Sequence, residues 1–213
     1  LDAGTQNWCV RAVAQDGTAV TEQFTLKLQK RGVTINAQPV QMTYGDEIAN
    51  YGTAQLVVDG YDGLDASAQA AIDEKLKDID LSQQRTGGFD TNVGTYSGEI
   101  TTVQSKESYE DGNANFTFTI VPADFTVNPA GFDGVTITAP TAQAYTGQEQ
   151  KLEPVLQREN LLLQKDTDYE IVGYAGDTVA AGDVTVSLKG KNNYEGAEAT
   201  ATYTIGKRTA TVT

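Results

Sequence analysis

A pattern of alternating apolar and polar residues returns three times along this chain. Each copy starts at a glycine, and the three glycines are Gly4, Gly94 and Gly182. They lie roughly 90 residues apart, which is about the size of one small domain. In the last copy Val184, Val186 and Leu188 alternate with polar residues. Alternation with a period of two places one face of a strand in a core and the other in water, as in antiparallel sheets. The pattern therefore predicts a mainly β protein made of tandem small β domains.

The repeats divide the sequence into three parts. Residues 1–31 are expected to be the C-terminal hairpin of a truncated preceding repeat, residues 32–125 a middle domain, and residues 126–213 a last domain. A hairpin of ~31 residues cannot bury a core alone, so the first part should lean on the middle domain or on a partner chain, or stay loosely held. No flexible Gly/Ser linker separates the parts, so neighbouring units are expected to join by a nearly continuous strand.

The two larger parts differ in their elements. Asp65 is placed to cap a helix running from about 66 to 78, with apolar residues at spacings of three and four. Two strand-like stretches, around 33–43 and 54–58, precede this helix, and two, around 94–103 and 115–121, follow it, which is the order of a β-grasp. Residues 126–213 offer six or so short strands and no helix, which favours an immunoglobulin-like sandwich.

The charge of the chain excludes several functions. Asp+Glu is 29 against 15 for Lys+Arg, the formal charge is −14, and there is no histidine. Such a chain repels phosphate backbones, and no run reaches the ~20 apolar residues of a membrane span, so neither nucleic-acid binding nor membrane insertion is expected. Histidine is the commonest general base. We therefore expect no catalytic residues, and we interpret paired carboxylates such as Asp166 and Asp168 as surface groups.

The single cysteine, Cys9, rules out an internal disulfide and has no histidine to activate it. The first residues lack the basic start and apolar stretch of a signal peptide, as expected for a fragment of a longer chain. The acidic, cysteine-poor composition favours an exported bacterial protein.

Short motifs in a fixed order resemble known bacterial repeats. Tyr44-Gly45-Asp46 and the following Asn92–Tyr96 and Ile120–Ala123 segments look like an MBG-type repeat of extracellular proteins. Tyr145-Thr146-Gly147 and Gly190–Gly196 resemble a bacterial Ig-like surface domain. The resemblance covers roughly residues 33–208 and implies a secreted or cell-wall-attached protein whose tandem modules act as stalk or spacer in cell adhesion. It implies no catalysis, no cofactor and no particular ligand.

One turn is a weak candidate for a metal site. Asp59, Asp62 and Asp65 bring three carboxylates into a turn with two glycines, and oxygen ligands suit Ca²⁺. The spacing does not match an EF-hand loop, and Asp65 is also the predicted helix cap. Calcium therefore stays open beside the simpler interpretation of a solvated turn.

Three aromatic residues, Trp8, Tyr61 and Tyr109, are weak candidates for binding a host glycan or protein, because aromatic rings stack on sugar faces. They are scattered along the sequence, and packing under loops is the competing interpretation. Lysine–asparagine cross-links also stay open. The sequence thus predicts a non-catalytic spacer that contacts neighbouring repeats of its own chain. The alternative is a ligand-binding module of an adhesin that recognises its ligand through loops such as residues 61–64 or 107–112, the second of which contains Tyr109.

Overall fold

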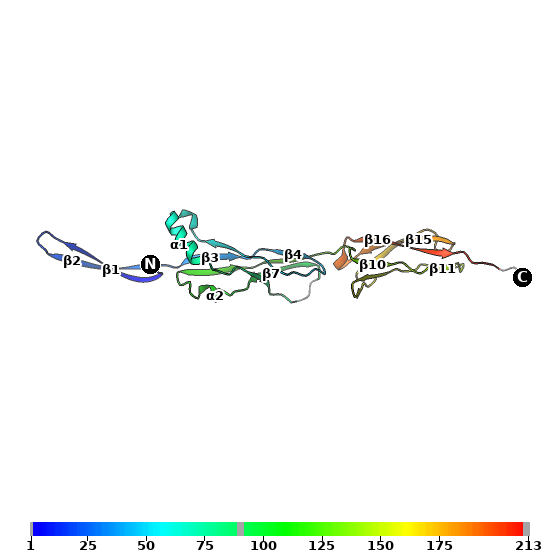
Figure 1. Ribbon diagram of the computed structural model, residues 1–213, viewed down its shortest axis with the longest axis horizontal. Helices are drawn as coiled ribbons and strands as arrows, with labels where there is room; N and C mark the ends of the chain where they lie inside the picture. The colour runs from blue at the N-terminus through cyan, green and yellow to red at the C-terminus, as the bar shows by residue number, and fades with distance from the viewer. Residues whose placement is uncertain (1, 89–91, 211–213) are drawn as a thin grey trace. The chain divides into compact units, whose positions relative to one another are not determined.

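A computed structural model describes residues 2–88 and 92–210 of the chain (Figure 1). Strands hold 48% of the residues and helices 11%, which confirms the predicted mainly β class with several small sheets. The chain forms two compact units. Unit 1 comprises Leu1–Val40, Ile48–Gly88 and Tyr96–Phe125, and unit 2 comprises Gln41–Glu47, Phe89–Thr95 and Thr126–Thr213. The division into residues 1–31, 32–125 and 126–213 stays a prediction.

The chain begins with a long hairpin. Strand β1 (Gly4–Val13) pairs with β2 (Ala19–Leu28) in an antiparallel register that runs from Gly4 opposite Leu28 to Val13 opposite Ala19. The two strands are the blue arrows of Figure 1. No residue of either strand is buried, since every position is exposed or half-buried. This hairpin therefore has no core of its own.

The core of unit 1 lies on a three-stranded sheet. Its order is β5-β3-β8, with bounds Gln55–Val58, Arg31–Asn36 and Phe116–Val121. Strand β3 is antiparallel to β5 and parallel to β8. The core side chains are contributed by alternate strand positions, by two helices and by the residue before β5: Val33, Ile35, Ala54, Leu76, Tyr109, Phe116 and Phe118.

Two helices and a 3₁₀ turn accompany this sheet. Helix α1 (Ala66–Leu76) confirms the predicted helix, and the Asp65 carboxylate caps it by accepting from the Ala68 amide at 2.9 Å. The 3₁₀ turn η1 (Tyr61–Gly63) precedes α1. Helix α2 (Lys106–Glu110) was not predicted; Ser105 caps it, and it lies in the chain between β7 (Gly94–Thr102) and β8.

A four-stranded sheet follows the order β4-β9-β7-β6, with bounds Val40–Thr43, Ala123–Asn128, Gly94–Thr102 and Gln83–Arg85. The sequence predicted one strand over 33–43, but the structure has two, because Pro39 interrupts the stretch between β3 and β4. Strands β7 and β8 belong to different sheets, with α2 between them in the chain. Unlike β1 and β2, strands β7 and β8 therefore do not form a hairpin with each other.

Unit 2 contains two sheets that share one core. The sheets follow the orders β10-β12-β13 and β11-β16-β15-β14. Their strands are β10 (Val135–Thr138), β11 (Gln143–Ala144), β12 (Val155–Arg158), β13 (Leu161–Leu162), β14 (Tyr169–Ala175), β15 (Gly182–Gly190) and β16 (Glu198–Gly206). The 3₁₀ turn η2 (Asn192–Tyr194) lies in the β15–β16 connection. Leu156, Val184, Val186 and Tyr203 belong to one buried cluster, so unit 2 has the sandwich-like character that its short alternating strands predict.

Candidate functional site

The most extensive parallel pairing in unit 1 joins β3 to β8, which are the first and the last strand of the three-stranded sheet in chain order. Six residue pairs run in register from Arg31 opposite Phe116 to Asn36 opposite Val121. Backbone hydrogen bonds continue at both ends, from the Arg31 amide to the Asn115 carbonyl and from the Ala37 amide to the Val121 carbonyl, each 2.9 Å. We call this ladder between β3 and β8 the terminal clamp of unit 1.

Apolar side chains cover the terminal clamp. Val33 and Phe118 are each 1% exposed, and Ile35 is fully buried. The Tyr109 ring of α2 stacks on Phe118 with ring centroids 5.6 Å apart, and its hydroxyl donates to the Asp80 carbonyl at 2.7 Å. Because a dry core lines this face, water has little access from that side to replace the ladder hydrogen bonds when they are strained.

Unit 2 has a shorter contact of the same kind. Strand β11 pairs in parallel with β16, the last strand of the unit, with Gln143 opposite Ile205 and Ala144 opposite Gly206. The Tyr145 amide adds a hydrogen bond to the Gly206 carbonyl at 2.8 Å. We call this ladder the terminal clamp of unit 2. It has two register pairs where that of unit 1 has six.

The buried side chain of Arg85 makes several contacts within the four-stranded sheet β4-β9-β7-β6. Arg85 of β6 is 7% exposed, and its Nε donates to Glu99 Oε2 at 2.6 Å. Its guanidinium also lies 4.2 Å from the ring centroid of Phe125 and 5.0 Å from that of Tyr96. Pairing with a carboxylate and with two ring faces compensates the loss of water around this charge. No local pattern in the sequence signals this arrangement.

One candidate for ligand binding in unit 1 is a cavity of about 390 Å³ beside η1. Its lining includes Leu56, Val57, Tyr61, Asp62 and Asp73. The Tyr61 hydroxyl donates to the Asp73 carboxylate, with distances of 2.8 and 2.7 Å to its two oxygens. This hydrogen bond, with the negative charge of Asp73 and partial desolvation, raises the pKa of Tyr61. The half-buried ring and the exposed Val57 supply an apolar wall next to carboxylates.

The three carboxylates of the predicted calcium turn have different surroundings. Asp65 caps α1, as described above. The Asp59 carboxylate lies against Gly32, where an added Cβ would be 2.1 Å from it. The backbone carbonyl of Asp59 accepts a hydrogen bond from the Arg31 guanidinium. Asp62 lines the cavity at Tyr61. Across the described residues no group of three or more carboxylate, cysteine or histidine side chains is arranged to hold a metal ion.

The predicted aromatic residues are not brought together. Trp8 is 43% exposed on β1 and Tyr61 is half-buried at its cavity, whereas Tyr109 is 1% exposed. Burial takes Tyr109 out of the candidate set, because a ligand has no access to its ring. The sequence placed Tyr109 in a loop; it lies instead in α2, which packs on β8.

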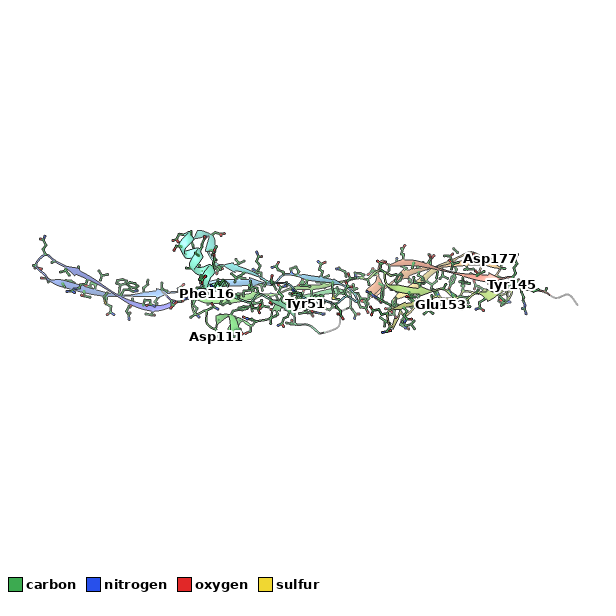
Figure 2. All side chains as sticks on the ribbon, viewed as in Figure 1. Tyr51, Asp111, Phe116, Tyr145, Glu153 and Asp177 are labelled. Atoms are coloured by element: carbon green, nitrogen blue, oxygen red, sulfur yellow. The ribbon has the colours of Figure 1, made fainter. Side chains whose placement is uncertain are left out.

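Two further carboxylates, Asp80 and Asp177, accept hydrogen bonds within local turns. Hydrogen bonds from the amides of Ala180 and Val179 lower the pKa of Asp177, and a hydrogen bond from Ser82 lowers that of Asp80. Asp177, Glu153 and Tyr145, which are labelled in Figure 2, are all exposed residues of unit 2. Exposed carboxylates held by backbone amides do not form the pair with split pKa values that acid–base catalysis uses.

No protein-family model matches the chain, and no curated protein matches its sequence. None of the helices formed by the described residues has the length and apolar character that a membrane span requires.

Proposed function

We propose that the chain is a non-catalytic, force-bearing spacer of a secreted or cell-wall-attached bacterial protein that functions in adhesion. The observation that carries this proposal is the parallel pairing of a terminal strand with a strand near the other end in each unit. Tension enters β3 at its N-terminal end, next to Arg31, and leaves β8 at its C-terminal end, next to Val121. In a parallel pair these two forces slide the strands past each other.

The direction of pulling decides how the force is distributed over the hydrogen bonds between two strands. When parallel strands are pulled from opposite ends, all bonds of the ladder share the force and must fail nearly together. When they are pulled from the same end, the bonds break one at a time. The terminal clamp of unit 1 therefore supports a role in which the module carries tension, and forced unfolding is governed by the barrier to this rupture.

Composition and resemblance support the location. A charge of −14 keeps neighbouring chains apart, and short domains repeated along a chain set its reach. The Tyr44-Gly45-Asp46 and Tyr145-Thr146-Gly147 motifs resemble those of bacterial surface repeats. The chain's partners are then neighbouring repeats of the same protein.

Stretching the chain between its two ends tests the spacer function. Opening the unit 1 clamp frees the roughly 90 residues from Arg31 to Val121, about 300 Å at ~3.4 Å per residue, and opening that of unit 2 frees about 210 Å, from Gln143 to Gly206. Since six pairs resist in unit 1 and two in unit 2, the longer event should need the higher force. Two events at the same low force would count against a load-bearing role.

A second function, recognition of a host glycan or protein, is favoured by the cavity at Tyr61. Its apolar wall and the carboxylates of Asp62 and Asp73 offer stacking and hydrogen bonding to a sugar. A glycan array probed with the wild-type chain and with Tyr61→Ala tests it. Tyr51→Ala is the matched control (Figure 2), because Tyr51 accepts a hydrogen bond from Gln83 through its backbone carbonyl, which the variant keeps. Saturable binding lost only in Tyr61→Ala would support recognition, and no binding on the array would remove this alternative.

A further inference from the structure

The hairpin β1–β2 has one apolar face and one polar face. Side chains on one face come from the register pairs Trp8 with Phe24, Gln6 with Leu26, and Val10 with Glu22. Trp8 is 43% exposed, Phe24 48% and Val10 57%. The pairs between them on the other face, such as Asn7 with Thr25 and Cys9 with Gln23, are mostly polar. A two-stranded hairpin with an uncovered apolar face is marginal in water.

The hairpin β15–β16 of unit 2 repeats this arrangement position by position. Both begin with Ala-Gly, the glycines have φ of +134° (Gly4) and +156° (Gly182), and each glycine is opposite a large aliphatic residue, Leu28 or Ile205. Three residues after each glycine, a cross-strand hydrogen bond joins polar side chains. Thr25 Oγ1 donates to Asn7 Oδ1 at 3.2 Å in one hairpin, and the Thr185 and Thr202 hydroxyls are 3.1 Å apart in the other.

The equivalent face is covered in one hairpin and uncovered in the other; β15 and β16 also pair with β14 and β11, whereas, among the described residues, β1 and β2 pair only with each other. Val186 occupies the register position of Trp8, and Leu188 that of Val10. Val186 is fully buried and Leu188 is 2% exposed. Their cover is the β10-β12-β13 sheet, which supplies Leu156 to the shared core and precedes β15 in the chain. The face that is buried in unit 2 is therefore exposed to solvent in β1–β2.

We propose that the apolar face of β1–β2 is a docking surface for a sheet formed by the polypeptide that immediately precedes residue 1 in the same protein. By this reading β1 and β2 are the last two strands of a further sandwich. The covering strands come before the hairpin, as β10, β12 and β13 come before β15–β16. This inference does not depend on the proposed spacer function, because it concerns only which surface the hairpin buries.

Thiol labelling of the two faces tests the proposal. Cys9 reports on the polar face, and Val10→Cys in a Cys9→Ser background reports on the apolar face; cysteine is a small apolar residue that the strand tolerates. Each is prepared in two proteins: residues 1–213, and the same chain extended by a natural upstream segment as long as residues 126–181. Val186→Cys and Ser187→Cys calibrate the buried and outer positions of β15.

In residues 1–213 both hairpin thiols should react at similar rates. In the extended protein the thiol of Val10→Cys should slow by ~100-fold or more while Cys9 keeps its rate. Trp8, the only tryptophan of residues 1–213, gives a second readout: iodide should quench it less in the extended chain once added tryptophans are replaced by phenylalanine. Equal rates in the extended protein would overturn the proposal. So would slow labelling of Val10→Cys in residues 1–213, with sedimentation telling whether a second copy or unit 1 itself covers the face.

Discussion

Truncating one core side chain should unfold one unit and leave the other folded. Ile35 lies near the C-terminal end of β3, is fully buried, and is opposite Leu56 of β5 and Ile120 of β8. Ile35→Ala removes three carbon groups from a site with strand neighbours on both sides, so we expect a loss of about 4 kcal/mol in the stability of unit 1. For a unit of about 100 residues this lowers the melting temperature by about 20 °C.

Unit 2 should not respond to Ile35→Ala, because its core cluster shares no residue with that of unit 1. Hydrogen exchange followed by mass spectrometry reports on both units in one sample as urea is raised. Val186→Ala is the matched variant, since Val186 is fully buried in unit 2 and its truncation should cost about 2 kcal/mol there alone. If Ile35→Ala weakened both units equally, the description of the chain as tandem domains would be refuted.

Three further predictions concern unit 1 and the pH dependence of both units. Asp65→Ala should cost about 1 kcal/mol in urea unfolding of unit 1, because the Ala68 amide loses its cap; Asp65→Asn should recover most of this, and equal losses would contradict the capping role. Arg85→Met should lower the stability of unit 1 by about 2 kcal/mol. Glu99→Gln should destabilise the Arg85→Met variant less than it destabilises the wild type, and strictly additive losses in this double-mutant cycle would show that the two side chains do not interact. Burial raises the pKa of Tyr109 and Tyr194, so their neutral forms favour the folded state. Stability should hold below pH ~10 and fall above it in circular-dichroism melts, and a flat profile to pH ~12 would contradict this.

The sequence was most informative where a local pattern decides the structure. The alternation of Val184, Val186 and Leu188 predicted β15, and the cap at Asp65 with apolar spacings of three and four predicted α1. These signals depend on neighbours within one element. Helix α2 was missed because it has only five residues and no apolar stripe, and its buried Tyr109 was therefore interpreted as a loop residue.

The features on which the proposed function depends were not predictable in this way. An alternating strand looks the same whether its partner runs parallel or antiparallel, so nothing near Arg31 indicates pairing with Phe116. The environment of Arg85 is assembled from Tyr96, Glu99 and Phe125, which follow it at irregular spacings. Contacts of this range come from topology, which residue patterns constrain only weakly.

Pulling one ladder in two directions tests the load-bearing role most directly. In a Cys9→Ser background, handles at Lys30→Cys and Val121→Cys slide β3 past β8, whereas handles at Lys30→Cys and Asp111→Cys pull the same ladder open from one end (Figure 2). All three positions are exposed, so both proteins should keep the wild-type melting temperature. The account predicts a rupture force several times higher for the first pair of handles. Equal forces in the two directions would contradict it.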